Sequence, residues 1–310
     1  MSRIFYCALM VLLLTGCGSG GTNDMSRATT DTRLNDIITN PAFGDYGRLI
    51  LPVNESYYSG DTLGTLRLTW YSYINPARTV EIVNYMLDEV REGRQIFYSI
   101  YPEDDPRARN TGLFFFRGRP GAKFAVCNAG GGFVFVGAMH DSFPHALELS
   151  RKGYNAFALI YRPGADTACE DLANAIAFIH EHAQDLGVDA SGYSLWGGSA
   201  GARMAAWLGT FGTEAFGVKA YPRPSAVIMQ YTGLSEVTGS EPPTYACVGT
   251  SDGIASYRVM QRRINAIKAN GTDAEIEIFA GLPHGFGLGE GTIAEGWIDN
   301  AVRFWERHSH

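Results

Sequence analysis

Ser199 stands in the pattern Gly197-Gly198-Ser199-Ala200-Gly201, where an apolar run ends and a helix-forming segment begins. A serine between two glycines in a tight turn from strand to helix exposes its Oγ, as a nucleophile requires. A side chain in place of Gly197 or Gly201 would crowd that turn. The pattern therefore predicts a serine nucleophile, and its alternative is a glycine-rich turn with an unreactive serine.

Three consecutive glycines, 130–132, follow the strand expected at 123–128. Glycines there leave backbone N–H groups free to approach a ligand oxygen, which an oxyanion hole requires. The N–H of Ala200, directly after the serine, is expected to form the second wall of that hole. A dinucleotide-binding fingerprint, Gly-x-Gly-x-x-Gly, fails at Phe135, whereas a purely structural glycine turn stays open.

Asp252 and His284 complete a possible set of catalytic side chains. Asp252 follows the strand expected at 244–249, and His284 follows the strand expected at 274–279. A carboxylate at a strand end can accept the imidazole Nδ1–H and hold the tautomer that acts as a base. The chain order Ser199, Asp252, His284 is the order found in α/β-hydrolases. The other histidines are less suitable because they precede the serine or lie at the C-terminus: His140, His145, His180, His182, His308 and His310.

Strands alternate with helices over most of the chain, which predicts an α/β fold with a mostly parallel, doubly wound sheet covered on both faces. Sites in such sheets lie at the carboxyl ends of the strands. We expect strands at 95–101, 112–117, 123–128, 154–161, 226–232, 244–249 and 274–279 and up to Ser199, and helices from Asp166, at 255–269 and at 293–306.

The segment 44–122 is expected to be a β-rich N-terminal extension that packs on the main sheet. Loose period-two patterns at 46–51 and 65–71 predict short strands. Asn75 as a cap and Gly93 as a stop predict an amphipathic helix between them. Nothing in residues 44–73 indicates chemistry, and the aromatic side chains there are interpreted as core.

From about 124 to 304 the chain resembles the α/β-hydrolases of the esterase and lipase superfamily. The likeness is closest to the hormone-sensitive-lipase-like and acetyl or feruloyl esterase branch, through GGGF, GGSAG and HGF. It implies that Ser199 attacks, that His284 is base and then acid, and that Asp252 orients it. It also implies that the N–H groups of Gly131, Gly132 and Ala200 bind the oxyanion. One departure is that Ala129 stands where the branch usually has a histidine that supports the loop.

The expected function is hydrolysis of a carboxylic ester through an acyl-enzyme, with no cofactor and no metal. The resemblance implies short, acetyl-like acyl groups on carbohydrate or small-molecule esters. A peptidase of the same fold and a non-catalytic, lipid-anchored binding protein on a hydrolase scaffold are the alternatives. Four side chains are weaker candidates for the substrate pocket: Tyr161, Arg162, Trp196 and Arg203.

The N-terminus resembles a bacterial lipoprotein signal peptide over residues 1–16, with Arg3, an apolar run at 4–14 and Leu14-Thr15-Gly16-Cys17. In such proteins the cysteine, here Cys17, carries the lipid, so we expect anchoring in the bacterial cell envelope, periplasmic or at the surface. An ordinary cleaved signal peptide is the alternative. Residues 17–43 are expected to be a flexible tether and residues 44–310 the α/β-hydrolase domain.

Composition limits the remaining possibilities. The chain has 310 residues, of which 45% are hydrophobic and 18% charged, as in ordinary globular proteins. A net charge of −7 without a dense Lys/Arg cluster argues against a nucleic-acid partner. Beyond Cys7 and Cys17, three cysteines remain, at 127, 169 and 247. An odd number inside apolar runs predicts small buried side chains and no disulfide framework.

Overall fold

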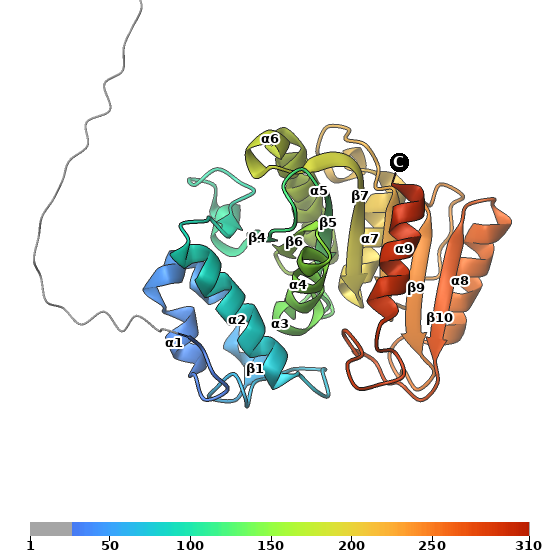
Figure 1. Ribbon diagram of the computed structural model, residues 1–310. Helices are drawn as coiled ribbons and strands as arrows, with labels where there is room; N and C mark the ends of the chain where they lie inside the picture. Colours follow the sequence, from blue (N-terminus) through green and yellow to red (C-terminus); the bar gives the residue numbers. More distant parts are fainter. Residues whose placement is uncertain (1–26, 310) are drawn as a thin grey trace, which may run out of the picture.

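The computed structural model describes residues 27–309, and an eight-stranded sheet forms the centre of that part of the chain (Figure 1). Six neighbouring strands are parallel, and β4 at one side runs antiparallel to both of its neighbours, β6 and β3. The sheet order is β10 (Ala274–Phe279), β9 (Thr244–Gly249), β8 (Ala226–Gln230), β7 (Asp189–Gly198), β5 (Lys123–Asn128), β6 (Asn155–Ile160), β4 (Gly112–Phe116) and β3 (Phe97–Tyr98).

Helices cover both faces of this sheet, which explains why β4, β6, β8 and β9 are buried along their whole length. Helix α4 (Phe143–Arg151) and helix α9 (Trp297–His308) meet through His145 and Trp297, whose rings lie 5.7 Å apart. Helix α5 (Ala165–Glu181) packs beside α7 (Ala200–Phe211), and α8 (Tyr257–Ala269) packs on β9 and β10. The expected doubly wound α/β architecture is confirmed.

Several strands and helices have the limits predicted from the sequence, and others begin or end at different residues. Strands β5, β9 and β10 begin and end where the sequence predicted. Helix α5 starts after Gly164, so Asp166 lies inside the helix and does not cap it. Helix α4 and the short helix α3 (Ala138–Asp141) were not predicted from the sequence. The cysteines at 127, 169 and 247 are free and buried, as expected.

The expected β-rich extension is wrong in its detail. The segment predicted as a strand at 46–51 falls largely within the 3₁₀ turns η1 (Pro41–Leu49), and the one predicted at 65–71 contributes only β2 (Arg67–Leu68), paired with β1 (Tyr58–Ser59). The Asn40 side chain accepts a hydrogen bond from the N–H of Ala42, with proline at position 41, and so starts a helical turn. Two further 3₁₀ turns are η2 (Glu55–Tyr57) and η3 (Pro106–Asn110).

The predicted helix after Asn75 is present as α2 (Pro76–Arg91), and the Asn75 side chain accepts hydrogen bonds from the N–H groups of Ala77 and Arg78. Both the cap and the proline at the first helical position follow from the sequence pattern. Helix α2 packs against α4 and η1. In Figure 1 the N-terminal segment, drawn from blue to teal and including α1 and α2, lies along one side of the sheet.

The expected tether at 17–43 requires a correction, because the chain is packed from Ala28 onward. The N–H of Ala28 donates to Asn84 Oδ1 at 2.8 Å, and its carbonyl accepts from Asn84 Nδ2 at 3.0 Å. Leu34 and Ile37 are buried on helix α1 (Leu34–Ile38). Apolar side chains at this spacing bury one helical face, so the folded domain includes residues that the polar composition had assigned to a linker.

Residues 1–26 and 310 are outside the described residues, and the expected signal peptide and Cys17 fall among them. Within residues 27–309, none of the helices combines the length and the apolar character needed to cross a bilayer.

Candidate active site

Ser199 occupies the sharp turn between β7 and α7, with a backbone φ of +52°. A side chain other than glycine at positive φ is strained, and such strain is characteristic of a nucleophile elbow. A Cβ at Gly197 would collide with the backbone of Gly201, and a Cβ at Gly201 would collide with the carbonyl of Asn128. The two glycines are therefore required by the close approach of β5, β7 and α7.

Asp252, His284 and Ser199 form a continuous chain of hydrogen bonds. His284 Nδ1 lies 2.8 Å from Asp252 Oδ2, and His284 Nε2 lies 3.1 Å from Ser199 Oγ. Because Nδ1–H donates to the carboxylate, Nε2 faces the serine hydroxyl as an acceptor. The structure thus brings together the three side chains that the chain order singled out.

The Asp252 carboxylate is buried, and its second oxygen is also occupied. Asp252 Oδ1 accepts hydrogen bonds from the N–H groups of Ile254 and Ala255, at 2.8 and 2.7 Å. Two backbone donors on one oxygen hold the other oxygen toward His284. The turn at Asp252 therefore fixes the direction in which the imidazole can be held.

The loops that carry Asp252 and His284 are bound to each other. The N–H of Thr250 donates to the carbonyl of Phe279 at 2.9 Å, and the N–H of Ser251 donates to the carbonyl of Leu282 at 3.1 Å. The N–H of Gly281 donates to Thr250 Oγ1 at 2.8 Å. Since β9 and β10 are adjacent parallel strands, their carboxyl ends place both loops at one edge of the sheet, where β7 also ends.

The glycine loop after β5 lies against Ser199. A Cβ at Gly130 would be 3.0 Å from Ser199 Cβ, and both Gly131 and Gly132 have positive φ, +129° and +62°. Within residues 27–309, no hydrogen bond engages the N–H groups of Gly131, Gly132 or Ala200. Free N–H groups beside a serine hydroxyl are suited to binding a negatively charged oxygen.

Asp141, at the end of α3, holds this loop and was not identified from the sequence. Asp141 Oδ2 accepts hydrogen bonds from the Gly130 N–H at 2.8 Å and from the Tyr71 hydroxyl at 3.0 Å, and Oδ1 accepts from the Tyr231 hydroxyl. Its side chain is only 2% exposed. A carboxylate that accepts from three donors therefore supports the loop next to Ala129, the position at which the resemblance had implied a supporting histidine.

The two tyrosines at Asp141 remain donors at any ordinary pH. Burial and the neighbouring Asp141 carboxylate raise the pKa of both Tyr71 and Tyr231 well above the usual value for a phenol. Tyr71 belongs to the segment that was expected to contribute only core aromatics. It is buried as expected, but its hydroxyl also donates to Asp141, the carboxylate that holds the glycine loop, 70 residues away in the sequence.

Each of the four weaker pocket candidates has a partner within the protein. Tyr161 is buried and donates to the carbonyl of Ala129 at 2.6 Å, and Trp196 is buried and donates to Ser194 Oγ at 2.7 Å. Arg162 pairs with Asp171 at 2.8 Å, and the Arg203 guanidinium lies 5.7 Å from the centre of the Trp207 ring.

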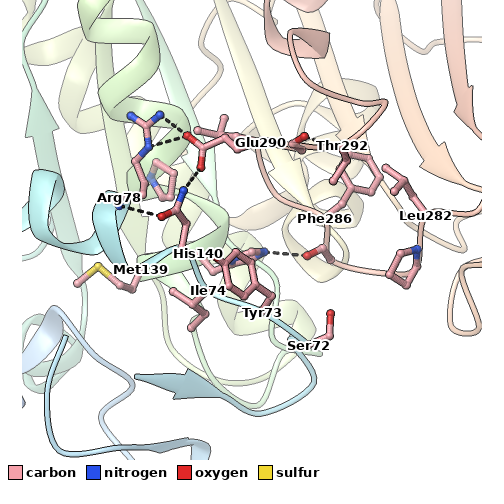
Figure 2. Close-up of a pocket in the computed structure, with 16 residues that line it drawn as sticks. Ser72, Tyr73, Ile74, Arg78, Met139, His140, Leu282, Phe286, Glu290 and Thr292 are labelled. Atoms are coloured by element: carbon pink, nitrogen blue, oxygen red, sulfur yellow. Dashed lines mark hydrogen bonds and ion pairs between the residues drawn. The ribbon is translucent and has the colours of Figure 1, made fainter. Parts of the chain in front are cut away.

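A cavity of about 150 Å³ lies between residues 72–78 of the N-terminal segment and residues 282–292 (Figure 2). Tyr73 and Ile74 line it from one side, and Leu282 and Phe286 from the other. His140 Nε2 lies 2.8 Å from the carbonyl of Gly285 and so joins α3 to the loop. Ser199 and His284 do not line this cavity, although residues on both sides of His284 do.

Comparisons with known proteins agree with the fold. The family model BD-FAE matches residues 119–257. The fold is similar to an acetyl ester-xyloside bifunctional hydrolase from Caldicellulosiruptor lactoaceticus, with 19% identity, a TM-score of 0.60, and coverage of 68% of this chain and 95% of that one. No curated protein sequence matches the chain.

Two further solved structures share the fold. MGS-M1, an alpha/beta hydrolase enzyme from a Medee basin deep-sea metagenome library, has 20% identity and a TM-score of 0.57 over 68% of this chain and 96% of that one. Thermogutta terrifontis esterase 2, phosphorylated by paraoxon, has 21% identity and a TM-score of 0.58 over 69% of this chain and 96% of that one. The chain has an α/β-hydrolase fold.

Proposed function

We propose that this protein is a serine hydrolase of carboxylic esters that acts through a covalent acyl-enzyme. The observation that supports it most directly is the hydrogen-bonded chain from Asp252 through His284 to Ser199, placed beside the free N–H groups of the glycine loop. The proposed base contacts both the proposed nucleophile and the orienting carboxylate, and N–H groups without a partner stand in the adjacent glycine loop, as stabilisation of an oxyanion requires.

The proposed reaction has two halves. Ser199 Oγ attacks the ester carbonyl carbon while His284 Nε2 takes its proton, and Asp252 stabilises the resulting imidazolium. The tetrahedral intermediate collapses, the bond to the alcohol oxygen breaks, and His284 returns the proton to that oxygen. Water then attacks the acyl-enzyme with the same histidine as base, which releases the acid and restores Ser199.

The N–H groups of Gly131, Gly132 and Ala200 are the proposed donors to the oxyanion in both halves. Removal of one such donor costs about 10² to 10³ in kcat in a serine hydrolase, so their placement contributes a large share of the rate. Asp141 acts one step away, since it anchors the N–H of Gly130 and so the position of the loop.

The proposed substrates are short acyl esters, acetyl-like in size, of carbohydrates or small alcohols. The name of the Caldicellulosiruptor hydrolase joins an acetyl ester to a xyloside, and the Thermogutta esterase has been solved with propionate bound. Between Ser199 and His284 the described chain has two long helices outside the strands, α7 and α8, and no long apolar insertion that would form a lid.

A p-nitrophenyl ester series from acetate to decanoate, measured on wild type and Ser199→Ala, tests the proposal. We expect the highest kcat/KM with acetate or propionate, and loss of nearly all turnover in Ser199→Ala with an unchanged circular dichroism spectrum. A fluorophosphonate probe should label wild type stoichiometrically and leave the variant unlabelled. Cleavage of aminoacyl amides without cleavage of esters would identify a peptidase instead, and failure to react with the probe would indicate a binding protein.

We further propose that Cys17 carries a lipid that anchors the protein in the bacterial cell envelope. The support is the pattern of Arg3, the apolar run at 4–14 and Leu14-Thr15-Gly16-Cys17. Metabolic labelling with an alkyne fatty acid should mark wild type and fail to mark Cys17→Ser. Labelling of neither protein, with cleavage before residue 17, would indicate an ordinary secreted form.

A further inference from the structure

Trp70 is unusual in two respects that folding does not explain. Its backbone φ is +70°, a conformation that suits glycine or asparagine, and its side chain is 55% exposed. It is the third residue of a turn closed by the Tyr71 N–H and the Leu68 carbonyl, 3.2 Å apart. A strained backbone that presents a large apolar ring to solvent is a feature that structures keep at functional sites.

The indole of Trp70 lies on the glycine loop beside the nucleophile. A Cβ at Gly132 would be 2.9 Å from Trp70 Cζ3, so the ring rests against this glycine and requires its lack of a side chain. The Trp70 and Phe135 ring centres are 5.5 Å apart. Because Gly132 carries a proposed oxyanion donor, the exposed indole borders the place where the substrate carbonyl must sit.

The residues on either side of Trp70 hold it there. The N–H of Thr69 donates to the carbonyl of Tyr57 at 2.9 Å. Tyr71 is buried, donates to Asp141, and packs so closely that a Cβ at Gly130 or at Gly285 would come within 3.0 Å of its ring or hydroxyl. Tyr71 is thus wedged between the glycine loop and the loop of His284. An aromatic ring fixed in this way binds a ligand with little loss of conformational freedom.

We propose that Trp70 is a specificity-determining residue whose exposed indole stacks on the sugar ring of a carbohydrate ester. This rests on the proposed function, because it names the alcohol part of that substrate. The face of an indole is large, apolar and electron-rich, and it complements the C–H face of a pyranose. The N-terminal segment thereby supplies the substrate platform for a reaction carried out by residues of the sheet.

The decisive test is a binding measurement that needs no catalysis. Isothermal titration of Ser199→Ala with xylotetraose should give measurable affinity, and Ser199→Ala/Trp70→Gly should bind about tenfold more weakly. Trp70→Asn, which also suits positive φ, should behave like Trp70→Gly, whereas Trp70→Phe should retain most of the affinity. Phe211→Ala is the matched control, because Phe211 is 47% exposed at the opposite end of α7 and should leave binding unchanged.

A second measurement separates stacking from support of the loop. In the active protein, Trp70→Gly should lower kcat/KM for acetylated xylo-oligosaccharide about tenfold more than kcat/KM for glyceryl triacetate, mainly through KM. Its melting temperature should not fall, since glycine relieves the strained φ.

Equal losses on both esters, or unchanged affinity of Ser199→Ala/Trp70→Gly for xylotetraose, would overturn the assignment. If wild type binds the oligosaccharide through Trp70 but hydrolyses no ester, the proposed function fails while the platform stands.

Discussion

Two regions of this molecule meet at Ser199, and they are built in different ways. Residues 112–309 contain the strands β4 to β10, and all of these except the edge strand β10 have a neighbouring strand on both sides. Residues 27–111 contain two-residue strands, 3₁₀ turns and the single long helix α2. The first region carries Ser199, Asp252 and His284, whereas the second carries Tyr71 and Trp70. The proposed reactive groups follow the ends of regular strands, whereas the residues that support the glycine loop from outside the sheet belong to irregular segments.

Two polar clusters join these regions. At Asp141, the Tyr71 hydroxyl from the N-terminal segment and the Tyr231 hydroxyl from the end of β8 share one carboxylate. At the cavity in Figure 2, Arg78 of α2 pairs with Glu290, in the loop beyond His284, and with Glu148 of α4 at 2.6 Å. Both clusters act on the loops around the site, so the N-terminal segment is expected to influence activity without taking part in bond making.

The largest effect is expected from the sheet region. Asp252→Asn should lower kcat about 10⁴-fold, because the amide favours the imidazole tautomer whose Nε2 carries the proton and cannot accept one from Ser199. Kinetics with p-nitrophenyl acetate would measure it, with Asp273→Asn as an exposed carboxylate control. A loss below tenfold would remove Asp252 from the proposed site.

Acid should destabilise the protein through a buried group of the sheet region. Burial lowers the pKa of His145 to about 4, so the folded protein favours the neutral imidazole while the unfolded chain binds a proton near pH 6.5. Stability is therefore complete above about pH 6.5 and is lost as the pH falls toward 4, by on the order of 3 kcal/mol. Urea unfolding from pH 4 to 7 should show this slope, and His145→Phe should flatten it. An unchanged slope in the variant would assign the effect to other groups.

A change at Asp141, which connects the two regions, should have an intermediate effect on kcat. Asp141→Asn should lower kcat about 100-fold with a smaller change in KM, because one amide oxygen cannot hold the Gly130 N–H and both tyrosine hydroxyls. Pre-steady-state acylation would measure it. If the variant loses stability but acylates at the wild-type rate, Asp141 is a folding residue only.

The smallest effects are expected when either tyrosine that donates to Asp141 is changed to phenylalanine. Tyr71→Phe and Tyr231→Phe each remove one hydroxyl from Asp141, and each should cost about 1 kcal/mol of unfolding free energy. Tyr71→Phe should also lower kcat several-fold, because Tyr71 alone is wedged between the glycine loop and Gly285. Paired denaturation and kinetics would show it. Equal kinetic effects would mean that the N-terminal segment has no special part in positioning the loops.

Local rules explain which features were predictable. Strands β5, β9 and β10 are short apolar runs bounded by turn residues, and α2 begins with Asn75 and proline 76, so their limits follow from neighbouring residues. The 3₁₀ turns at 41–49 contain enough aromatic and apolar residues to imitate a strand, and only the side-chain cap at Asn40 distinguishes them. The helix at 143–151 had a signal, Pro144 in its first turn, that the strand-dominated pattern concealed.

The sequence by itself determined the parallel sheet and the order Ser199, Asp252, His284, because strand patterns, glycine turns and the loops that end strands are local properties of the chain. Only the tertiary structure decided that Asp141 supports the glycine loop and that Tyr71 and Trp70 border it. The hydroxyls of Tyr71 and Tyr231 reach Asp141 from 70 and 90 positions away along the chain, and no local pattern marks which distant hydroxyls will share its carboxylate. Folding brings such groups together by packing whole elements, and the spacing of residues along a chain carries no record of that packing.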